Sequence, residues 1–308
     1  MSDIVISEFM DEAAIAEVFA GRDVLYDPAL VDRPEALAAA LADCRALLVR
    51  NRTQVRGALL DAAPKLRVVG RLGVGLDNID VEACAARGII VRPATGANDL
   101  SVAEYVITAA LMLLRRAWFA SEPVAAGAWP RMALIGRELA GKRLGLVGFG
   151  AIARLTADKA RALGMDVAAF DPFLAEEHPA WAGVERLELA GLLASSDVVS
   201  LHTPLTPQTR RMIDAAAIAG MKPDAILINA ARGGVVDEAA LAQALKAGRL
   251  GGAALDVFET EPVTAASGAV FQGVPNLILT PHIAGVTEES NVRVSTVTAR
   301  AVIAVLDA

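Results

Sequence analysis

Short apolar runs alternate with helical stretches along the first hundred residues of the chain. The apolar runs cover residues 4–6, 46–49, 66–69 and 89–91, and the Ala-rich helical stretches between them include 34–42 and 81–87. Apolar runs that alternate with helices in this way are typical of parallel strands joined by crossover connections. This part of the chain is therefore predicted to form a parallel sheet with crossover helices.

The alternation starts again near residue 143. Before it, an apolar helix is predicted over 99–116, and Ser101 and Glu104 near its start have the spacing of a capping box. The later apolar runs cover residues 144–147, 167–170, 198–201, 225–228, 253–255 and 277–279, and a last helix is predicted over 288–306. Because 308 residues are enough for about two domains, the pattern predicts an α/β protein built on two parallel sheets.

A glycine-rich turn, Gly148-Phe149-Gly150-Ala151-Ile152-Ala153, stands between the run 144–147 and a helical stretch. Its first glycine would make the tight turn, its second would let a pyrophosphate approach the backbone, and its small third position would let helix and strand pack closely. The helix N-terminus would offer N–H groups and a positive dipole end to the phosphates. Gly148, Gly150, Ala151 and Ile152 are therefore predicted to bind a dinucleotide, with a purely structural turn as the alternative.

Asp171 indicates which dinucleotide binds. It ends the run 167–170, about 20 residues after the glycine turn, where a carboxylate accepts hydrogen bonds from the adenosine ribose. Its charge would repel a 2′-phosphate, and the next residues, Pro172 and Phe173, supply no arginine to compensate. NAD is therefore predicted rather than NADP.

A second glycine cluster, Gly73-Val74-Gly75, also follows an apolar run. The next run, 89–91, leads to Arg92-Pro93-Ala94-Thr95 and offers no acid for a ribose. We interpret the cluster as a loop whose backbone N–H groups bind a small anion. A plain tight turn is the alternative.

Composition excludes several classes of protein. Hydrophobic residues make up 55% of the chain and aromatic residues only 4%, which predicts an aliphatic core like that of buried parallel sheets. The net charge of −7 argues against a nucleic-acid partner. Cys44 and Cys84 have no metal-type spacing and indicate neither a metal site nor a disulfide framework. Without a signal-like N-terminus or an apolar run near the ~18 residues of a membrane span, we expect a cytoplasmic protein with no membrane partner.

Two of the three histidines follow predicted strands, where open α/β sheets bind ligands. His202 follows the run 198–201 and could line a cofactor, and His282 follows the run 277–279. His178 lies in a polar stretch and is expected at the surface. Proton transfer from an alcohol needs such a base, and the residues alone do not separate His202 from His282.

Arg232 and Glu261 are further candidates. Arg232 lies between the run 225–228 and two glycines, a position that points a side chain into a cleft, and its planar fork suits a carboxylate. An ordinary loop arginine is the alternative. Glu261 precedes a proline, and taken alone it is more typical of a solvated loop acid than of a catalytic one.

Four motifs extend over nearly the full length of the chain. They are the glycine turn at 147–153, Asn229-Ala230-Ala231-Arg232-Gly233-Gly234, the segment 256–262 that ends in Glu261-Pro262, and Thr280-Pro281-His282. In this order they resemble the D-isomer-specific 2-hydroxyacid dehydrogenase family, most of all its phosphoglycerate-dehydrogenase-like branch. The resemblance implies an NAD-dependent oxidoreductase that interconverts a D-type 2-hydroxy acid and its 2-oxo acid.

The resemblance also implies roles for individual residues. His282 would be the acid/base at the substrate hydroxyl, and Glu261 would orient its imidazole and favour the protonated form. Arg232 would bind the substrate carboxylate, together with the backbone of Val74 and Gly75. The implied cofactor-binding residues beyond the glycine turn and Asp171 are His202, Thr203, Pro204, Ala230 and Asp256.

The domain organisation implied by the resemblance is discontinuous. An NAD-binding Rossmann domain, residues 98–282, would be inserted into a flavodoxin-like substrate domain formed by 1–97 and 283–308. Both would be doubly wound parallel sheets, with the active site in the cleft and a hinge that closes on the substrate. Members of the family are typically dimers, so a homodimer is expected.

Three arginines indicate a substrate with a second anion. Arg50 and Arg71 each follow or end a predicted strand beside the second glycine cluster, and Arg131 in Trp129-Pro130-Arg131 resembles a further arginine of the phosphoglycerate branch that reaches a neighbouring subunit. We therefore predict a phosphate or sulfonate at C3. Surface arginines paired with acids are the alternative.

The segment 6–12 is similar to sulfolactate dehydrogenases of the family. It favours conversion of sulfolactate to sulfopyruvate, with 3-phosphoglycerate dehydrogenase as the alternative. In a different class, an NAD-sensing corepressor-like binding protein would keep the same motifs.

Overall fold

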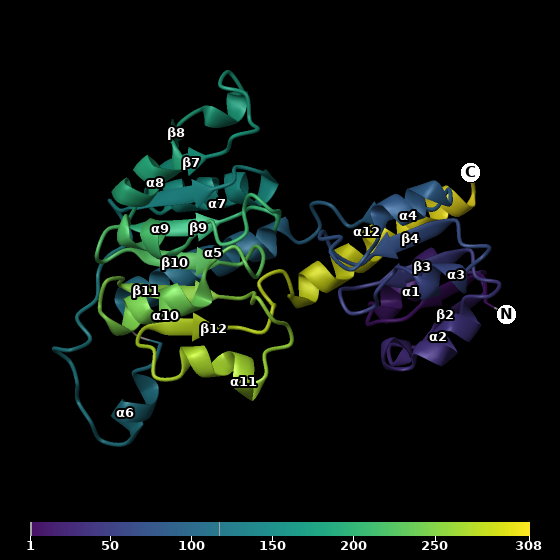
Figure 1. Ribbon diagram of the computed structural model, residues 1–308, viewed down its shortest axis with the longest axis horizontal. Coiled ribbons are helices and arrows are strands. Elements are labelled where there is room, and N and C mark those ends of the chain that lie inside the picture. Colours follow the sequence, from purple (N-terminus) through teal and green to yellow (C-terminus); the bar gives the residue numbers. More distant parts are fainter. Residues whose placement is uncertain (1, 117) are drawn as a thin grey trace. The chain divides into compact units, whose positions relative to one another are not determined.

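The computed structural model describes residues 2–116 and 118–308, which divide into two compact units. Unit 1 consists of Met1–Asn98 and Val286–Ala308, and unit 2 consists of Asp99–Gly285 (Figure 1). Unit 2 is therefore a continuous insertion in the chain of unit 1. Its second border lies after Gly285, three residues later than the sequence placed it, because backbone N–H groups of 283 and 284 donate to the Asp256 carboxylate of unit 2.

Unit 1 is built on a parallel sheet with the strand order β2-β1-β3-β4-β5, counted over the described residues. This is the order of flavodoxin-like sheets. The strands are β1 (Ile4–Ile6), β2 (Val24–Tyr26), β3 (Ala46–Val49), β4 (Val68–Arg71) and β5 (Ile90–Pro93). The helices are α1 (Glu12–Val18), α2 (Pro34–Ala40), α3 (Ala58–Asp61), α4 (Val81–Ala86) and α12 (Glu288–Leu306).

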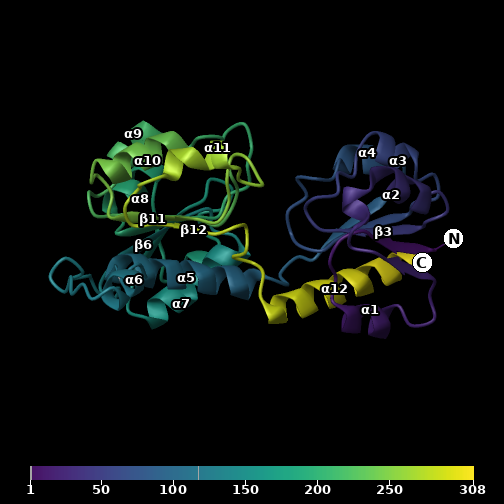
Figure 2. The same ribbon diagram turned by 90° about the horizontal axis from the view of Figure 1, so that it is seen from below.

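Helices cover both faces of the unit 1 sheet. α1 and α12 pack on one face and α2, α3 and α4 on the other, so the buried aliphatic side chains form two clusters (Figure 2). α12 lies so close to β4 that a Cβ at Gly70 would be 2.7 Å from Val302 and 2.8 Å from Thr298. The C-terminal helix α12 is therefore part of the same compact unit as the first hundred residues.

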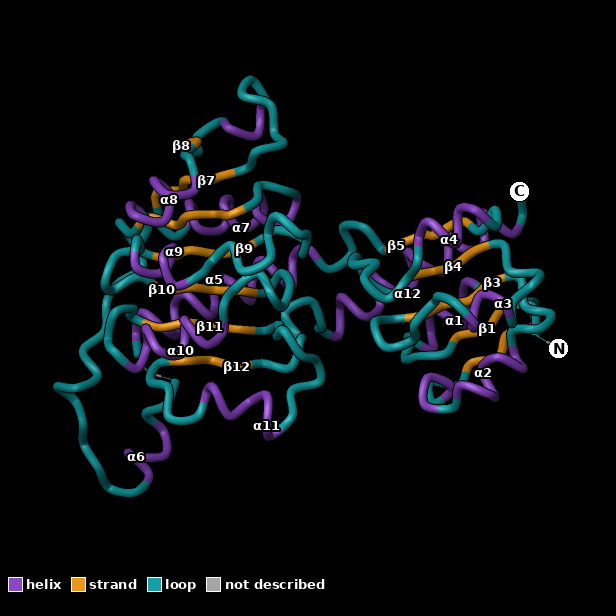
Figure 3. The backbone as a smooth tube through the Cα atoms, in the orientation of Figure 1, coloured by secondary structure: helices purple, strands orange, loops and turns teal. Residues whose placement is uncertain are grey.

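Unit 2 is built on a second parallel sheet, with the order β12-β11-β10-β9-β6-β7-β8 in the described chain (Figure 3). Relative to its first strand β6, this is the Rossmann order 3-2-1-4-5-6 with one more strand at the end. The strands are β6 (Arg143–Val147), β7 (Asp166–Phe170), β8 (Glu185–Arg186), β9 (Val198–Leu201), β10 (Ile226–Asn229), β11 (Gly252–Leu255) and β12 (Leu277–Leu279). The helices are α5 (Asp99–Arg115), α6 (Ser121–Ala125), α7 (Ala151–Ala162), α8 (Leu189–Ser195), α9 (Ala215–Ala219), α10 (Glu238–Lys246) and α11 (Ala265–Gly268).

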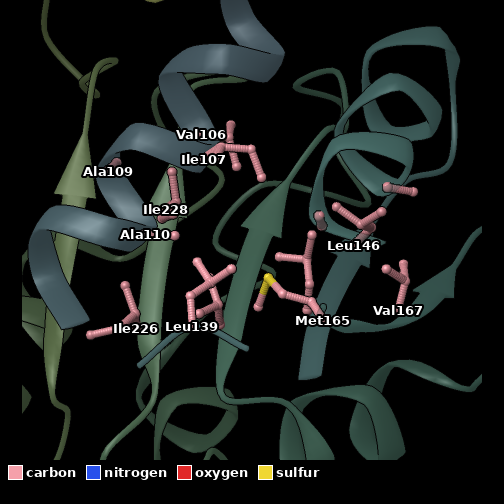
Figure 4. Close-up of a cluster of buried hydrophobic side chains, with 14 of the residues drawn as sticks. Val106, Ile107, Ala109, Ala110, Leu139, Leu146, Met165, Val167, Ile226 and Ile228 are labelled. Carbon is pink, nitrogen blue, oxygen red and sulfur yellow. The ribbon is translucent and has the colours of Figure 1, made fainter. Parts of the chain in front are cut away.

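The core of unit 2 also has two layers (Figure 2). α5 and α7 pack on one face of the sheet, where Ile107 and Ala110 meet Leu146 and Ile228 (Figure 4). α8, α9 and α10 cover the other face. Since all strands are parallel, their carboxyl ends lie at one edge of the sheet, and the candidate residues that follow β6, β7, β9, β10, β11 and β12 gather there.

The structure corrects details of the predicted elements. β4 starts two residues later than predicted, and the edge strands β2 and β8 were missed because they carry no fully buried apolar run. Ser101 is buried inside α5, which begins at Asp99, so it is not the N-cap. Among the described residues, no helix is both long enough and apolar enough to cross a membrane.

Candidate active site

The glycine turn has the geometry that its sequence predicts. Gly148 has φ +87°, and a Cβ there would be 2.6 Å from the backbone oxygen of His202, so a larger residue does not fit. Gly150 is the N-cap of α7, and a Cβ there would meet open space. The first turn of α7 contains no acidic residue, so its N–H groups and dipole face outward without a competing charge.

Asp171 lies beside this turn. Its Oδ2 accepts a hydrogen bond from the N–H of Phe149 at 2.8 Å, and its Oδ1 accepts from the N–H groups of Phe173 at 2.9 Å and Leu174 at 3.2 Å. The carboxylate is thus held rigidly by three backbone donors. Because Oδ2 accepts only one of these bonds, it keeps capacity for a ribose hydroxyl.

The turn after β9 faces the glycine turn and carries a polar atom that needs a partner. In the described part of the chain, Thr203 Oγ1 is buried and has no hydrogen-bond partner. Its methyl group would be 3.1 Å from a Cβ at Gly148. An orphaned hydroxyl next to a glycine cradle fits a bound dinucleotide, since buried polar groups are otherwise satisfied.

His202 is in a different environment from His282. Its Nε2 lies 3.0 Å from the buried Ser200 Oγ, and burial lowers its pKa to about 4. The ring is therefore neutral at pH 7. A neutral, inward-bonded imidazole can line a cofactor pocket but cannot donate a proton to a substrate at that pH.

Arg232 is presented by a turn that follows β10. The side chain of Asn229, which is buried, accepts from the N–H of Ala231 and donates to the carbonyl of Arg232 at 2.9 Å. A Cβ at Gly233 would be 1.8 Å from the carbonyl oxygen of Phe258, so only glycine lets these two loops approach. This approach brings the charge of Arg232 close enough to lower the pKa of Glu261.

Glu261 and His282 form a hydrogen-bonded pair. His282 Nδ1 lies 2.7 Å from Glu261 Oε2, while Oε1 accepts from the N–H of Phe258 at 2.9 Å. Burial raises the pKa of Glu261, but the His282 bond, the Phe258 N–H and the charges of His282 and Arg232 together hold it below its ordinary value. The His282 side chain is 41% exposed, and no described residue bonds its Nε2, so this nitrogen faces outward.

Asp256 fixes the backbone that carries His282. His282 has φ +57°, a conformation that non-glycine residues rarely adopt. Its N–H donates to the Asp256 carbonyl at 2.8 Å, and the Asp256 carboxylate accepts from the N–H groups of Ile283 and Ala284, both at 2.8 Å. The family resemblance implies only a cofactor contact for Asp256, and this second role is visible only in the structure.

A hydrogen-bond chain extends from Asp256 to α5. The Thr280 hydroxyl donates to Asp256 Oδ1 at 2.6 Å, and the Tyr105 hydroxyl lies 2.6 Å from Thr280 Oγ1. Burial raises the pKa of Asp256, while these donors and the nearby His282 act in the opposite direction. Tyr105 could have been suspected from sequence only as a polar group on an otherwise apolar helix.

Unit 1 carries the other predicted residues, at the carboxyl edge of its own sheet. β3 and β4 are paired with Val49 opposite Arg71, so Arg50 and Arg71 leave neighbouring strand ends. Gly73 has φ +146°, and a Cβ there would be 1.5 Å from Nη1 of Arg71, so this glycine makes room for the guanidinium. Val74 is exposed and Gly75 is half-buried in the loop that follows.

Arg131 is the one predicted residue that the structure does not bring to a strand end. It is exposed in the segment after α6, which Figure 1 shows beyond the edge strand β12. Pro204, Ala151, Ile152 and Ala230 lie at the carboxyl edge of the unit 2 sheet. Within the described residues, no group of three His, Cys, Asp or Glu side chains is placed to bind a metal ion.

Known proteins share this architecture. Residues 107–284 match the family model described as D-isomer specific 2-hydroxyacid dehydrogenase, NAD binding domain. The chain is 57% identical over 299 residues to an (S)-sulfolactate dehydrogenase of Chromohalobacter salexigens, which covers 97% of this chain and 96% of that protein.

Two further similarities are informative. A D-3-phosphoglycerate dehydrogenase of Mycobacterium bovis is 43% identical over 274 residues, which are 88% of this chain but 51% of that protein, so this chain spans about half its length. Among solved structures, a D-lactate dehydrogenase from Aquifex aeolicus in complex with NAD and lactic acid has a TM-score of 0.85 at 28% identity, over 99% of this chain and 95% of that one.

Proposed function

The chain belongs to the D-isomer specific 2-hydroxyacid dehydrogenase family and is an NAD-dependent enzyme that interconverts 2-hydroxy and 2-oxo acids, and from this premise we propose how its residues act. The observation that carries the proposal is the Glu261–His282 pair beside Arg232. It combines a base, an acid that orients the base and a cation for the substrate carboxylate.

His282 is the proton-transfer group. When bound, NAD⁺ accepts the hydride from C2 of the hydroxy acid. His282 Nε2 takes the proton of the C2 hydroxyl as that hydride leaves, and the former O–H electron pair becomes the second bond of the carbonyl. In the reverse direction the same nitrogen returns the proton to the carbonyl oxygen.

Glu261 and Arg232 prepare this transfer. Glu261 accepts a hydrogen bond at Nδ1, which directs Nε2 to the substrate and stabilises the imidazolium formed during oxidation. Arg232 binds the C1 carboxylate with its guanidinium fork and polarises the adjacent carbonyl in the reductive direction. In unit 1, the backbone N–H groups of Val74 and Gly75 are proposed to bind an anionic group of the substrate.

NAD is held by the glycine turn and the residues opposite it. The N–H groups at the start of α7 would bind the pyrophosphate, Asp171 Oδ2 would accept a hydrogen bond from the ribose, and Thr203 Oγ1 would gain the partner that it lacks. The neutral ring of His202, with Pro204, Ala230 and Asp256, would complete the set of residues that hold the cofactor.

The His282→Asn variant tests the assignment. We expect turnover to fall at least about 1,000-fold, within the range lost with a general base, while the Kd for NADH changes less than about threefold. His178→Asn is the matched control, because His178 caps the short helix Pro179–Trp181, about 100 residues before His282 in the chain. This variant should leave both quantities unchanged. Substantial turnover by His282→Asn would remove this residue from the mechanism.

The substrate has a second anion at C3, and (S)-sulfolactate fits best. Support comes from Arg50 and Arg71 at neighbouring strand ends and from the 57% identity to an (S)-sulfolactate dehydrogenase over nearly both full lengths. The configuration at C2 is also consistent with this family. Replacing the lactate methyl by CH₂–sulfonate raises that substituent above the carboxylate in naming priority. The spatial arrangement of D-lactate is then named S. D-3-phosphoglycerate is the alternative substrate.

Arg50 and Arg52 form a matched pair for a test of this second anion. Arg52 is exposed and forms an ion pair with Asp32, whereas no described carboxylate lies within ion-pair distance of Arg50. Arg50→Gln should raise KM for sulfolactate about 10- to 100-fold, as expected when a hydrogen bond between charged groups is lost, and should leave D-lactate nearly unchanged. Arg52→Gln should change both by less than about threefold. Equal effects of Arg50→Gln on both substrates would rule out the second-anion site.

The enzyme assembles as a homodimer through unit 2. Trp129 and Met132 are each 78% exposed and Ile135 is 64% exposed, and Leu111 and Met112 on α5 are also exposed. Large exposed apolar side chains of this kind are typical of a protein interface. Trp129→Glu with Met132→Glu should produce monomers in sedimentation analysis; an unchanged mass would contradict this interface. In the dimer Arg131 reaches the partner's substrate.

A reducing compartment suits the chain. Cys44 and Cys84 are both free thiols in the interior. Free buried thiols together with a soluble cofactor such as NAD are typical of cytoplasmic enzymes. We therefore place the enzyme in the cytoplasm.

A further inference from the structure

Residues 7–9, which follow β1, pack against residues 50–53, which follow β3 and which we call the anion loop. β1 and β3 are parallel neighbours, so both segments leave the same edge of the sheet. Ser7 Oγ lies 3.1 Å from Thr53 Oγ1, and the N–H of Ser7 donates to the Leu48 carbonyl. The segment singled out by its similarity to sulfolactate dehydrogenases is therefore the one that shapes the anion loop.

Glu8 is the centre of this contact. It is only 4% exposed, and its Oε1 accepts from the N–H groups of Arg50 at 2.9 Å and Thr53 at 3.0 Å, while Oε2 accepts from the N–H of Arg52 at 3.2 Å. All three donors are neutral amides. Within residues 2–116 and 118–308 no cation lies within ion-pair distance of this carboxylate, so its charge is buried without being cancelled by contact.

Arg50 is held ready for a ligand by the same elements. Its Nη2 donates to Asn291 Oδ1 at 2.9 Å, and its guanidinium lies 5.5 Å from the centre of the Phe9 ring. Burial lowers the pKa of Arg50, and the charge of Glu8 acts in the opposite direction. Glu8 therefore acts on the Arg50 guanidinium through space and not by a hydrogen bond. N–H donors of the guanidinium remain available for a ligand.

We propose that Glu8 is a specificity-determining residue that makes the anion loop prefer a singly charged sulfonate over a doubly charged phosphate at C3. This rests on the proposed function, in which Arg50 and Arg71 bind that group. Glu8 subtracts one unit from the positive charge that the two arginines present. A sulfonate carries one negative charge, whereas a phosphate monoester carries about 1.5 to 2 at pH 7. The additional negative charge of the phosphate is repelled by Glu8. The net positive charge of the site is too small to compensate for this repulsion.

The Glu8→Gln variant tests the charge. Its amide oxygen still accepts from the N–H groups of Arg50 and Thr53, its NH₂ group then faces the N–H of Arg52, and the charge is gone. A unit charge acting over ~10 Å at an effective dielectric constant of ~20 changes an affinity about tenfold. We expect the ratio of kcat/KM for D-3-phosphoglycerate to kcat/KM for (S)-sulfolactate to rise about tenfold. Glu8→Asp keeps the charge and shortens the side chain, so it should lower both values and leave their ratio within about twofold.

A wild-type measurement gives the same test without a variant. The second pKa of a phosphate monoester is near 6, whereas the sulfonate does not titrate in this range. Between pH 8 and pH 6 the ratio of phosphoglycerate to sulfolactate kcat/KM should rise as the phosphate gains a proton. A pH effect on the proton-transfer step is common to both substrates and cancels in the ratio.

Two outcomes are kept apart by the controls. If Arg50→Gln affects sulfolactate and D-lactate equally, the proposed second-anion site fails, and this inference fails with it. If Arg50→Gln is selective but Glu8→Gln leaves the ratio unchanged, or if the wild-type ratio is flat with pH, only the role of Glu8 is refuted. Glu17→Gln removes the same charge from an exposed position on α1 and should change nothing.

Discussion

Replacing Asp256 by asparagine separates two roles for this residue, one in fixing the His282 turn and one in contacting the cofactor. The carboxylate is 1% exposed and accepts one O–H and two N–H groups from Thr280, Ile283 and Ala284. The asparagine side chain has the same size and shape as the aspartate. Its oxygen can replace Oδ1 and keep two of these bonds, and its NH₂ group must then face the N–H of Ala284.

The cost follows from this change. One hydrogen bond to a charged acceptor is lost, and a buried N–H is left facing another donor; such losses are worth about 1.5–3 kcal/mol. Removing a buried charge, whose burial raises the pKa of Asp256, offsets part of this. We therefore expect unit 2 to lose about 1–3 kcal/mol in its free energy of unfolding. The left-handed backbone at His282 is then less firmly held, which should lower kcat at least about tenfold.

Urea unfolding, steady-state kinetics and NADH binding measure these quantities together. Asp214→Asn is the matched control, because an asparagine can still cap α9 as Asp214 does, and it should change stability by less than about 0.5 kcal/mol. A variant with unchanged stability and kcat but a weakened Kd for NADH would refute the argument, since it would show that Asp256 serves the cofactor and not the turn.

Two further predictions follow from the cofactor side. The folded-state pKa of His202, about 4, lies below its ordinary 6.5, so on acidification the unfolded chain binds the proton first and stability falls between pH 6.5 and pH 4. His202→Gln should remove up to about 3 kcal/mol of this loss in urea titrations at pH 7 and pH 4.5; equal losses in both proteins would contradict the burial argument. Gly148→Ala should weaken NADH binding at least about tenfold and destabilise unit 2, because its Cβ would be 2.6 Å from the His202 carbonyl oxygen. Gly191→Ala, in a helix with open space around it, should be neutral or stabilising; equal behaviour of the two variants would rule out the steric explanation.

The central strands could be predicted from sequence because a strand buried on both faces is apolar at every position. β1 and β3 have the predicted bounds for this reason. The edge strands β2 and β8 are partly or fully exposed; β2 is an apolar run of only three residues, and β8 consists of two charged residues. Their pairing depends on a neighbour already in place.

The candidate site was predictable where a local motif carries the chemistry. The glycine turn and Asp171 are recognisable from spacing, and the structure adds the hydrogen bond from Phe149 that joins them. His202 and His282 could not be separated by their positions after strands. Their surroundings differ, since one ring contacts Ser200 and the other contacts Glu261.

Long-range contacts account for what the sequence did not show. Glu8 and the anion loop are about 40 residues apart in the chain, and Tyr105 and Thr280 are 175 residues apart. A buried carboxylate that binds only backbone N–H groups leaves no pattern in a single sequence. Asp256 was recognised as part of a motif, but its role in holding His282 follows only from the convergence of the 283 and 284 N–H groups.

The central claim is that this dehydrogenase acts on a 2-hydroxy acid with a second anion at C3. The most direct measurement is the initial rate of NAD⁺ reduction by the wild-type enzyme with (S)-sulfolactate and with D-lactate at the same pH. Two or more hydrogen bonds from arginines to the second anion predict a kcat/KM at least about 100-fold higher for sulfolactate. Equal values, or a preference for lactate, would contradict the account.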